Sequence, residues 1–393
     1  MKKLKAVEFF LSLGLAASLA AGCAAPDGNA SNEAVETAPA GEVEGGEGGE
    51  GGEGAMSQSL NWGNRFDDEA TIAAFTETVV IPSYTQYADR TAALDQAIDA
   101  FASQPSEESL AAARQAWSEA RIAWETTETF AFGPAGSLGF DGAMDSWPVN
   151  QTDIENILSG SEPITVEQVA GLQDTERGMH AIEYLLFGTE ASKTVDEFSD
   201  RENSFLIALG QDLNNSADAL LASWQEGIDG RPAYKTVFAS AGSSDNMVYP
   251  TTTAAAQELV SGIIDSLTEV GEEKLAAPFE EQDTQGLESR FSAQTMNDLK
   301  SNLQSAENGY FGRLSAENFQ AEASISDYVA GLDPELDEKV KAEFSTADEA
   351  LNAIPTPLEE HLTDPAAKAD IERAIASILN VKTTLENEIV PLI

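Results

Sequence analysis

The stretch Leu110-Ala-Ala-Ala-Arg-Gln-Ala-Trp117-Ser-Glu-Ala-Arg121-Ile-Ala-Trp124-Glu-Thr-Thr-Glu128-Thr-Phe130 carries the clearest fold signal of this 393-residue chain. Its large side chains recur with the 3.6-residue period of an α-helix, and four residues fall on one stripe of that helix: Trp117, Arg121, Trp124 and Glu128. Apolar residues keep this period through most of the chain after Asn61, whereas alternating β-branched runs are nearly absent. The sequence therefore predicts an all-α protein.

The same periodicity predicts further helices at 92–102, 205–224, 254–270, 295–309 and 371–389. Prolines, which begin or end helices, lie between these runs: Pro148, Pro163, Pro250, Pro278 and Pro334. The length that follows residue 58 exceeds what one hydrophobic core usually serves, which favours two helical bundles. Because the region 227–246 is polar and rich in turn residues, we expect an N-terminal bundle at 59–235 and a C-terminal bundle at 236–393.

The amino terminus has the features of a secretion signal, with three lysines before an apolar run that ends at Ala21. The pattern Leu19-Ala-Ala-Gly-Cys23 resembles a bacterial lipobox, in which the signal is cut before the cysteine and the thiol receives a lipid. We therefore expect residues 1–22 to be a lipoprotein signal peptide. The mature chain would be lipid-anchored through Cys23 in the bacterial cell envelope, facing the periplasm or held at the outer membrane. A soluble secreted protein with an incidental cysteine is the alternative.

Acidic residues dominate the rest of the composition. Residues 23–58 lack hydrophobic periodicity and end in Gly-Gly-Glu repeats, which predicts a disordered tether. The net charge of the chain is −47, from 21 basic and 68 acidic residues. Such a surface repels phosphate backbones and anionic lipid, so we expect no nucleic-acid partner and no membrane contact beyond the lipid anchor.

The segment Gly178-Met-His180-Ala-Ile-Glu183 holds one of only two histidines in the chain. Residues three apart lie on one face of a helix, so His180 and Glu183 can share a metal ion or a proton. From spacing alone, a surface histidine hydrogen-bonded to its neighbour is the competing interpretation. Gly178 inside a helix costs about 1 kcal/mol relative to alanine, so we expect another element to approach closely there. This helix should begin near Asp174 or Thr175 and end at Gly188.

This pattern resembles the G-x-H-x-x-E motif of the imelysin-like family, also called the M75 or iron-regulated protein A family. Three further segments resemble that family in the same order: 116–134, 145–148 with Trp147, and 286–312 with Glu288, Arg290 and Ser292. The resemblance implies two helical bundles related as a degenerate repeat, with the motif helix near their junction. It also implies a link to iron regulation and uptake, and a metallopeptidase activity.

A metal at His180 and Glu183 would need further ligands. Zinc peptidase sites are usually rich in histidine, but Tyr184 follows Glu183, and His361 is the only other imidazole. An oxygen-rich site suits iron better than zinc, since helical bundles readily combine a His and a Glu with acids from other helices. The candidate additional ligands are Glu128, Asp145 and Glu288.

Several other residues are expected around such a site. Trp117, Arg121 and Trp124 form either a core stripe or one wall of a cleft. By resemblance, Arg290 and Ser292, with Glu288, would close the cleft opposite His180 from an extended segment. The alternative is that Ser292 caps a helix starting near Ala293, while Glu288 and Arg290 are surface charges.

Three functions remain open from the sequence. The first is an envelope lipoprotein that binds a metal, most readily iron, or an iron-linked ligand at the bundle junction and serves iron acquisition with envelope uptake partners. The second is an M75-type metallopeptidase with Glu183 as its catalytic residue. The third is a non-catalytic surface scaffold that binds a polymer or a protein. Nucleophile elbows and phosphate-binding glycine loops are missing from the sequence.

Overall fold

Helices make up almost all of the regular structure. The computed structural model describes residues 60–189, 191–314, 319–320 and 323–393, so the expected signal peptide, Cys23 and the tether lie outside it. Within this part, the only sheet is an antiparallel pair of two-residue strands, β1 (Arg313–Leu314) and β2 (Phe319–Gln320). The all-α prediction is confirmed. Among the described helices, none has the length and apolar character that crossing a membrane requires.

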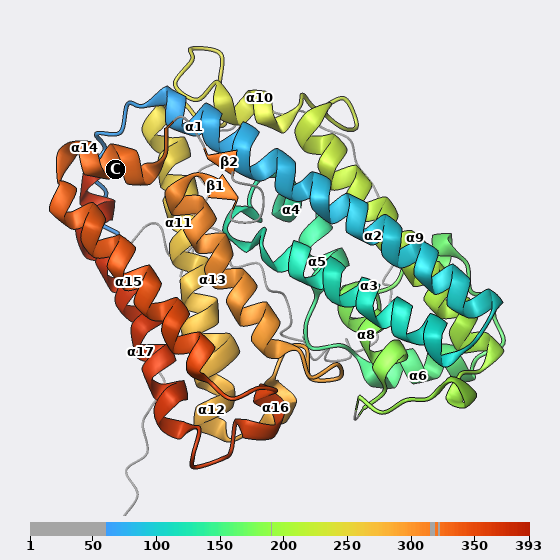
Figure 1. The fold of residues 1–393 in the computed structure, drawn as a ribbon. Helices are drawn as coiled ribbons and strands as arrows, with labels where there is room; N and C mark the ends of the chain where they lie inside the picture. Colours follow the sequence, from blue (N-terminus) through green and yellow to red (C-terminus); the bar gives the residue numbers. More distant parts are fainter. Residues whose placement is uncertain (1–59, 190, 315–318, 321–322) are drawn as a thin grey trace, which may run out of the picture. The chain divides into compact units, whose positions relative to one another are not determined.

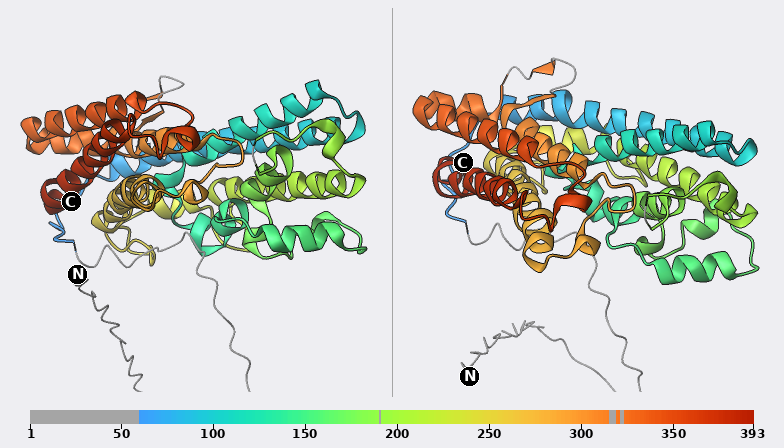
Figure 2. Two further views of the ribbon diagram at one scale, coloured as in Figure 1. Left: turned by 90° about the horizontal axis from the view of Figure 1, so that it is seen from below. Right: turned by 60° about the horizontal axis from the view of Figure 1, so that its bottom comes forward.

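The helices of the first half pack around three long members, α2, α3 and α9, which lie side by side (Figure 1). The second half is built on α11, α13, α15 and α17, and the pairs α11 with α13 and α15 with α17 are in contact (Figure 2). The first-half helices are α1 (Glu69–Phe75), α2 (Ile81–Ser103), α3 (Glu107–Glu125), α4 (Pro134–Ser137), α5 (Phe140–Asp145), α6 (Gln151–Ser159), α7 (Val166–Val169), α8 (Gly178–Phe187) and α9 (Asp200–Gln225). The second-half helices are α10 (Tyr234–Ala239), α11 (Thr252–Thr268), α12 (Ala277–Glu281), α13 (Thr295–Phe311), α14 (Ile325–Leu332), α15 (Pro334–Ala353), α16 (Leu358–His361) and α17 (Lys368–Thr384).

Each segment with a predicted helical period lies in a helix, but the stripe on α3 ends earlier than expected. The hydroxyls of Thr126 and Thr127 donate to the carbonyls of Ala123 and Trp124, at 2.8 and 2.7 Å. The backbone N–H of Thr127 donates to the Trp124 carbonyl, three residues back, at 2.7 Å, so the α-helical pattern of bonds stops and α3 ends at Glu125. Glu128 instead begins a 3₁₀ turn, Glu128–Phe130, and is not on the helix that carries Arg121.

Among the described residues, three helices contain π-helical turns, each followed two residues later by a proline. The turns are Thr76–Val80, Glu269–Ala276 and Leu385–Ile389, and the prolines are Pro82, Pro278 and Pro391. A proline within a helix lacks an N–H and clashes with the carbonyl four residues earlier, and a wider turn relieves that clash. Pro278 therefore does not separate two helices as expected, because α11 continues through the second π-turn into α12.

The two halves of the sequence meet closely at the 3₁₀ turn Glu128–Phe130. A Cβ atom on Gly262 of α11 would lie 2.0 Å from the Thr129 carbonyl oxygen, and one on Gly309 of α13 would lie 2.8 Å from the Thr129 methyl carbon. The Thr129 N–H donates to Ser305 Oγ of α13 at 3.0 Å. Buried apolar residues of both halves form one continuous cluster. The predicted boundary between the two bundles, at 235/236, is not tested by these contacts and stays a prediction.

Candidate metal centre

The motif helix α8 is positioned by Gly178. This residue has φ +76°, and a Cβ atom there would lie 2.4 Å from the Met144 carbonyl oxygen. The expected close approach is therefore made by α5, whose last residue is Asp145, and it brings Asp145 next to His180. Helix α8 begins at Gly178 and not near Asp174, because Asp174–Glu176 forms a separate 3₁₀ turn. It ends at Gly188 as predicted.

Trp117 and Trp124 belong to the core and also hold the site in place. Both indoles are buried. The Trp117 Nε1–H donates to the Met179 carbonyl oxygen in the first turn of α8, at 2.9 Å. The Trp124 Nε1–H donates to Asp145 Oδ2 at 2.7 Å. The core interpretation therefore fits both rings, which pack inward while their N–H groups bond to α8 and to Asp145, and the cleft stays a prediction.

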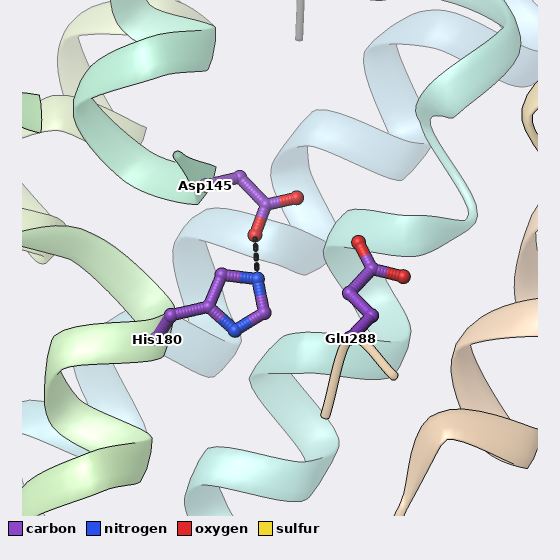
Figure 3. Close-up of side chains that lie close together, drawn as sticks. All are labelled: Asp145, His180 and Glu288. Atoms are coloured by element: carbon purple, nitrogen blue, oxygen red, sulfur yellow. Dashed lines mark ion pairs between the residues drawn. The ribbon is translucent and has the colours of Figure 1, made fainter. Parts of the chain in front are cut away.

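Three side chains converge on one point, as Figure 3 shows: Asp145, His180 and Glu288. One potential ligand atom from each lies within 4.8 Å of the others. The residues are 4%, 0% and 2% exposed, respectively. His180 Nε2 lies 3.3 Å from Asp145 Oδ1, whereas Glu288 Oε2 has no hydrogen bond or ion pair among the described residues.

Glu183 lies on the other side of the imidazole ring. Its Oε2 is 3.3 Å from His180 Nδ1. Its Oε1 accepts hydrogen bonds from both the backbone N–H and the hydroxyl of Ser292, each at 2.8 Å. With Nδ1 directed at Glu183, the ring presents Nε2 to Asp145 and Glu288. A carboxylate in this position holds one tautomer and one orientation of a metal-binding histidine.

Two buried cations face the carboxylates of this region. Arg121 ion-pairs with Asp145, with Glu125 at 2.6 Å, with Glu288 at 2.7 Å and with Asp298 at 3.4 Å. We call these five residues, together with His180, Glu183 and Lys274, the buried charge cluster.

Lys274, which lies on the second π-turn, also reaches the cluster. Its Nζ is 3.1 Å from Glu288 and 3.5 Å from Glu125, and it donates to Asn302 Oδ1 at 3.3 Å. Asn302 in turn donates to Glu125 Oε2 at 2.6 Å. Segments from both halves of the chain therefore supply the cluster.

Protonation follows from burial and from these contacts. Burial raises the pKa of Asp145, but Arg121 and His180 outweigh it, and the pKa lies below its ordinary value. Burial lowers the pKa of His180, but the adjacent carboxylates Asp145 and Glu183 raise it to about 9. Burial raises the pKa of Asp298 to about 7, since Arg121 offsets it only in part. The apo cluster therefore holds protons at neutral pH.

The model of the imelysin family, peptidase M75, matches residues 80–385. The chain belongs to the imelysin family. It is 40% identical over 323 residues to iron-regulated protein A of Synechococcus elongatus (strain ATCC 33912 / PCC 7942 / FACHB-805), covering 82% of this chain and 86% of that protein.

Two solved structures share the imelysin fold. One, from Parabacteroides distasonis ATCC 8503, is assigned as an iron-regulated protein A precursor; its TM-score is 0.75 at 23% identity, with 86% of this chain and 98% of that chain covered. The other is an imelysin-like protein from Psychrobacter arcticum 273-4, with a TM-score of 0.64 at 14% identity, covering 82% and 94% of the two chains. At these identities the structures support the fold alone.

The other residues predicted from the sequence lie outside the group of three converging residues, some of them next to it. Glu128 is half-buried and outside the group of three converging residues. The Trp147 ring lies 4.8 Å from the His180 ring, between centroids, and the Arg290 guanidinium lies 4.1 Å from the Phe291 ring. His361 is 30% exposed at its side chain and faces Asp364.

The alternative that treated Ser292 as a helix cap is wrong. Helix α13 begins at Thr295, and Ser292 bonds to Glu183 across the site. The segment 288–293 consists of turns and is not extended as expected. Glu288 is also not a surface charge, because only 2% of its surface is exposed.

Sequence reasoning missed Glu125, Lys274, Asp298 and Asn302. A signal for three of them was present: Glu125 follows Arg121 by four residues, and Asp298 and Asn302 are four apart on one face of α13. No such signal was present for Lys274, because its position next to the cluster depends on the π-turn.

The donor set fits a metal ion. It provides one imidazole, which would bind a metal after losing its proton, and two carboxylates, which are the ligands of mixed nitrogen and oxygen sites for iron. Arg121 contacts Asp145 and Glu288 through one oxygen of each carboxylate and leaves Glu288 Oε2 without an ion pair or hydrogen bond among the described residues. When bound, the metal would supply a positive charge that this carboxylate-rich cluster lacks.

Proposed function

We propose that this imelysin-family protein binds a metal ion, iron in preference to zinc, through Asp145, His180 and Glu288, and that it serves iron acquisition in the cell envelope. The observation that carries the proposal is the convergence of three buried donor residues, in which Glu288 Oε2 has neither a hydrogen bond nor an ion pair among the described residues. Buried polar atoms normally find partners. The name of the Synechococcus relative, iron-regulated protein A, supports an iron-related role.

The burial of the donors favours a bare ion over an iron-linked ligand. Asp145, His180 and Glu288 are at most 4% exposed, and Arg121 covers two of the carboxylates at 1% exposure. A chelate would have to bring organic atoms into contact with these groups, whereas a dehydrated ion needs only the space between three donor atoms. We therefore propose that the metal enters without its carrier.

In this proposal Glu183 orients His180 and does not bind the metal. Its oxygens are directed at His180 Nδ1 and at Ser292, on the opposite side of the ring from Asp145. Second-shell partners of this kind typically change metal affinity by about 10- to 100-fold. The M75-type peptidase alternative gives Glu183 the role of general base, but no exposed surface of Glu183 is available to a peptide, because its exposure is 0%.

We also propose that residues 1–22 are a signal peptide, that Cys23 carries the lipid, and that the chain from Cys23 to residue 58 is a tether. The sequence features that support it are the lipobox-like Leu19 to Cys23 and the acidic repeats. The protein would then work at the membrane surface and deliver its ion to uptake partners of the envelope.

The test is elemental analysis of the purified protein after equilibrium dialysis against iron or zinc, combined with a peptide-hydrolysis assay. His180→Ala and Glu288→Ala should each abolish retention, and Ser292→Ala should weaken affinity by about 10- to 100-fold. His361→Ala is the matched control and should retain metal like the parent. If the parent binds neither metal, the scaffold alternative replaces this proposal. If the parent hydrolyses peptides and Glu183→Ala does not, the peptidase alternative replaces it.

A further inference from the structure

We infer that a pocket beside α6 and α9 binds a small carboxylic acid with an unbranched apolar chain, independently of the proposed metal-binding function. The pocket has a volume of ≈ 370 Å³ and is lined by residues of α6, α7, the start of α9 and the segment between α6 and α7 (Figure 1). We call it the α6–α9 pocket. Its volume is within the range of small-molecule sites, about 300 to 1,000 Å³. None of its lining residues belongs to the buried charge cluster.

Most of the α6–α9 pocket is apolar. Its most deeply buried lining residues are Val169 and Phe205, at 1% and 0% exposure. The half-buried side chains of Ile157, Ile164 and Leu172 pack against the core and also line the pocket. An apolar ligand would remove this surface from water, which is favourable. Since a cavity of about 150 Å³ holds one benzene molecule, this pocket has room for a chain of roughly eight to ten carbons.

One cation lines this apolar pocket, Arg201 in the first turn of α9. Its Nε and Nη2 donate to the Ile157 carbonyl oxygen at 2.9 and 2.7 Å, and its Nη1 donates to the Glu162 carbonyl oxygen at 2.9 Å. These bonds hold the guanidinium in place. They use three of its five N–H donors and leave one on each Nη. Among the described residues, no carboxylate forms an ion pair with Arg201.

A carboxylate suits the two N–H groups that Arg201 has left. Its two oxygens can accept one hydrogen bond from each Nη, in the paired geometry that arginine commonly forms with carboxylates. Gly160 keeps Nη2 accessible, because a Cβ atom there would lie 3.4 Å from that nitrogen. An inorganic anion would leave the apolar walls uncovered, and a hydrocarbon would leave the N–H groups without an acceptor. A carboxylic acid with an apolar chain satisfies both parts of the pocket.

Glu162 allows the sign of the ligand charge to be tested. Its carbonyl oxygen holds Arg201, but its side chain is exposed at the edge of the pocket. This carboxylate would repel an anionic ligand bound to Arg201. Glu162→Gln removes the charge and keeps the backbone carbonyl, so it should strengthen binding of a carboxylate by about two- to fivefold. A neutral ligand should not gain from the change.

The experiment compares octanoate with 1-octanol, which has the same chain but no charge, by isothermal titration calorimetry of the full-length protein. We expect one octanoate per chain, bound at least about tenfold more tightly than octanol. Arg201→Gln should remove this difference and leave octanol binding unchanged. Arg231→Gln is the matched control: it makes the same change of charge at an exposed arginine that does not line the pocket, and it should leave both affinities unchanged.

Three results would overturn the inference: no octanoate binding by the parent, octanol binding as tight as that of octanoate, or several octanoates per chain whose binding does not depend on Arg201. If Arg201→Gln loses octanol as well, the pocket itself has collapsed, and Glu162→Gln then decides. Octanoate affinity that does not rise in Glu162→Gln overturns the inference in that case. Elemental analysis of Arg201→Gln should show metal retention equal to that of the parent, so a failure of the metal-binding proposal is seen separately.

Discussion

His180 and Arg121 approach the same carboxylate oxygen from two sides. Arg121 Nη1 ion-pairs with Asp145 Oδ1, and His180 Nε2 is 3.3 Å from that atom. The fixed positive charge of Arg121 keeps Asp145 ionised, with a pKa below its ordinary value despite burial. A metal therefore does not compete with a proton for Asp145. It competes with the proton on the imidazole, and the pH dependence of binding should report on His180.

Metal affinity should fall as the pH drops below about 9. Contacts with Asp145 and Glu183 outweigh burial and raise the pKa of His180 to about 9. Below this pH the metal must displace the imidazole proton, which costs about tenfold in affinity for each pH unit, and above it the dependence should level off. An ordinary imidazole, with a pKa of about 6.5, would show the loss only in more acidic buffer.

Dissociation constants for zinc, measured from pH 6 to pH 10 with a chelator of known pH dependence, check this prediction. His361→Ala should give the same curve, because that histidine is not in the cluster. A curve that is flat down to about pH 7 would contradict the proposed protonation of His180.

At the residue scale, sequence could locate the three residues that converge, but not the contacts that each of them makes. Asp145, His180 and Glu288 were all candidates, found through the spacing of the motif and the family resemblance. The position of Glu183 on the Nδ1 side of the ring depends on Ser292, more than a hundred residues later in the chain. Which carboxylate lies at which ring nitrogen is decided by tertiary packing, and no local pattern encodes it.

At the scale of elements, helix periodicity predicted which segments are helical, but helix ends and π-turns needed the structure. The end of α3 depends on the backbone N–H of Thr127, which bonds to the carbonyl three residues back, not four. The π-turn that carries Lys274 depends on Pro278 being kept inside a helix by its packing. Proline usually ends a helix, so the sequence favoured the wrong alternative there.

Gly178→Ala should destabilise the protein and weaken metal binding. Alanine at φ +76° is strained, and its Cβ would lie 2.4 Å from a backbone oxygen of Met144, which can move only with α5. We expect the free energy of unfolding to fall by about 2 to 4 kcal/mol. Since α5 carries Asp145, the donor group should also be displaced.

Chemical denaturation and metal dialysis of the same variant measure both effects. Gly230→Ala is the matched control, because Gly230 has φ +77° but nothing lies within 4 Å of the position of its Cβ. That change should cost about 1 kcal/mol from backbone strain alone and leave metal affinity unchanged. Equal costs at the two positions would show that the contact with Met144 does not constrain α8.

At the scale of the whole molecule, the proposed anchor determines where the protein works. Cys23→Ser should release the protein from the membrane fraction, because the described residues contain no helix able to span a membrane and the net charge of −47 repels anionic lipid. Fractionation of cells that express the parent and the variant measures this directly. A variant that stays in the membrane fraction would contradict lipidation as the means of attachment.

Metal removal should lower the melting temperature of the protein in one cooperative transition. The donors come from both halves of the sequence, with Asp145 and His180 in the first and Glu288 in the second, and one buried apolar cluster runs through both. An ion that binds only the folded state adds about 2.7 kcal/mol of stability when its free concentration is 100 times its dissociation constant. Because the proposed ion would link the two halves, calorimetry should show a single transition that moves upward as metal is added, while His180→Ala shows no shift. If two transitions appeared and metal moved only one of them, the halves would unfold independently, and the donors would not act together across them.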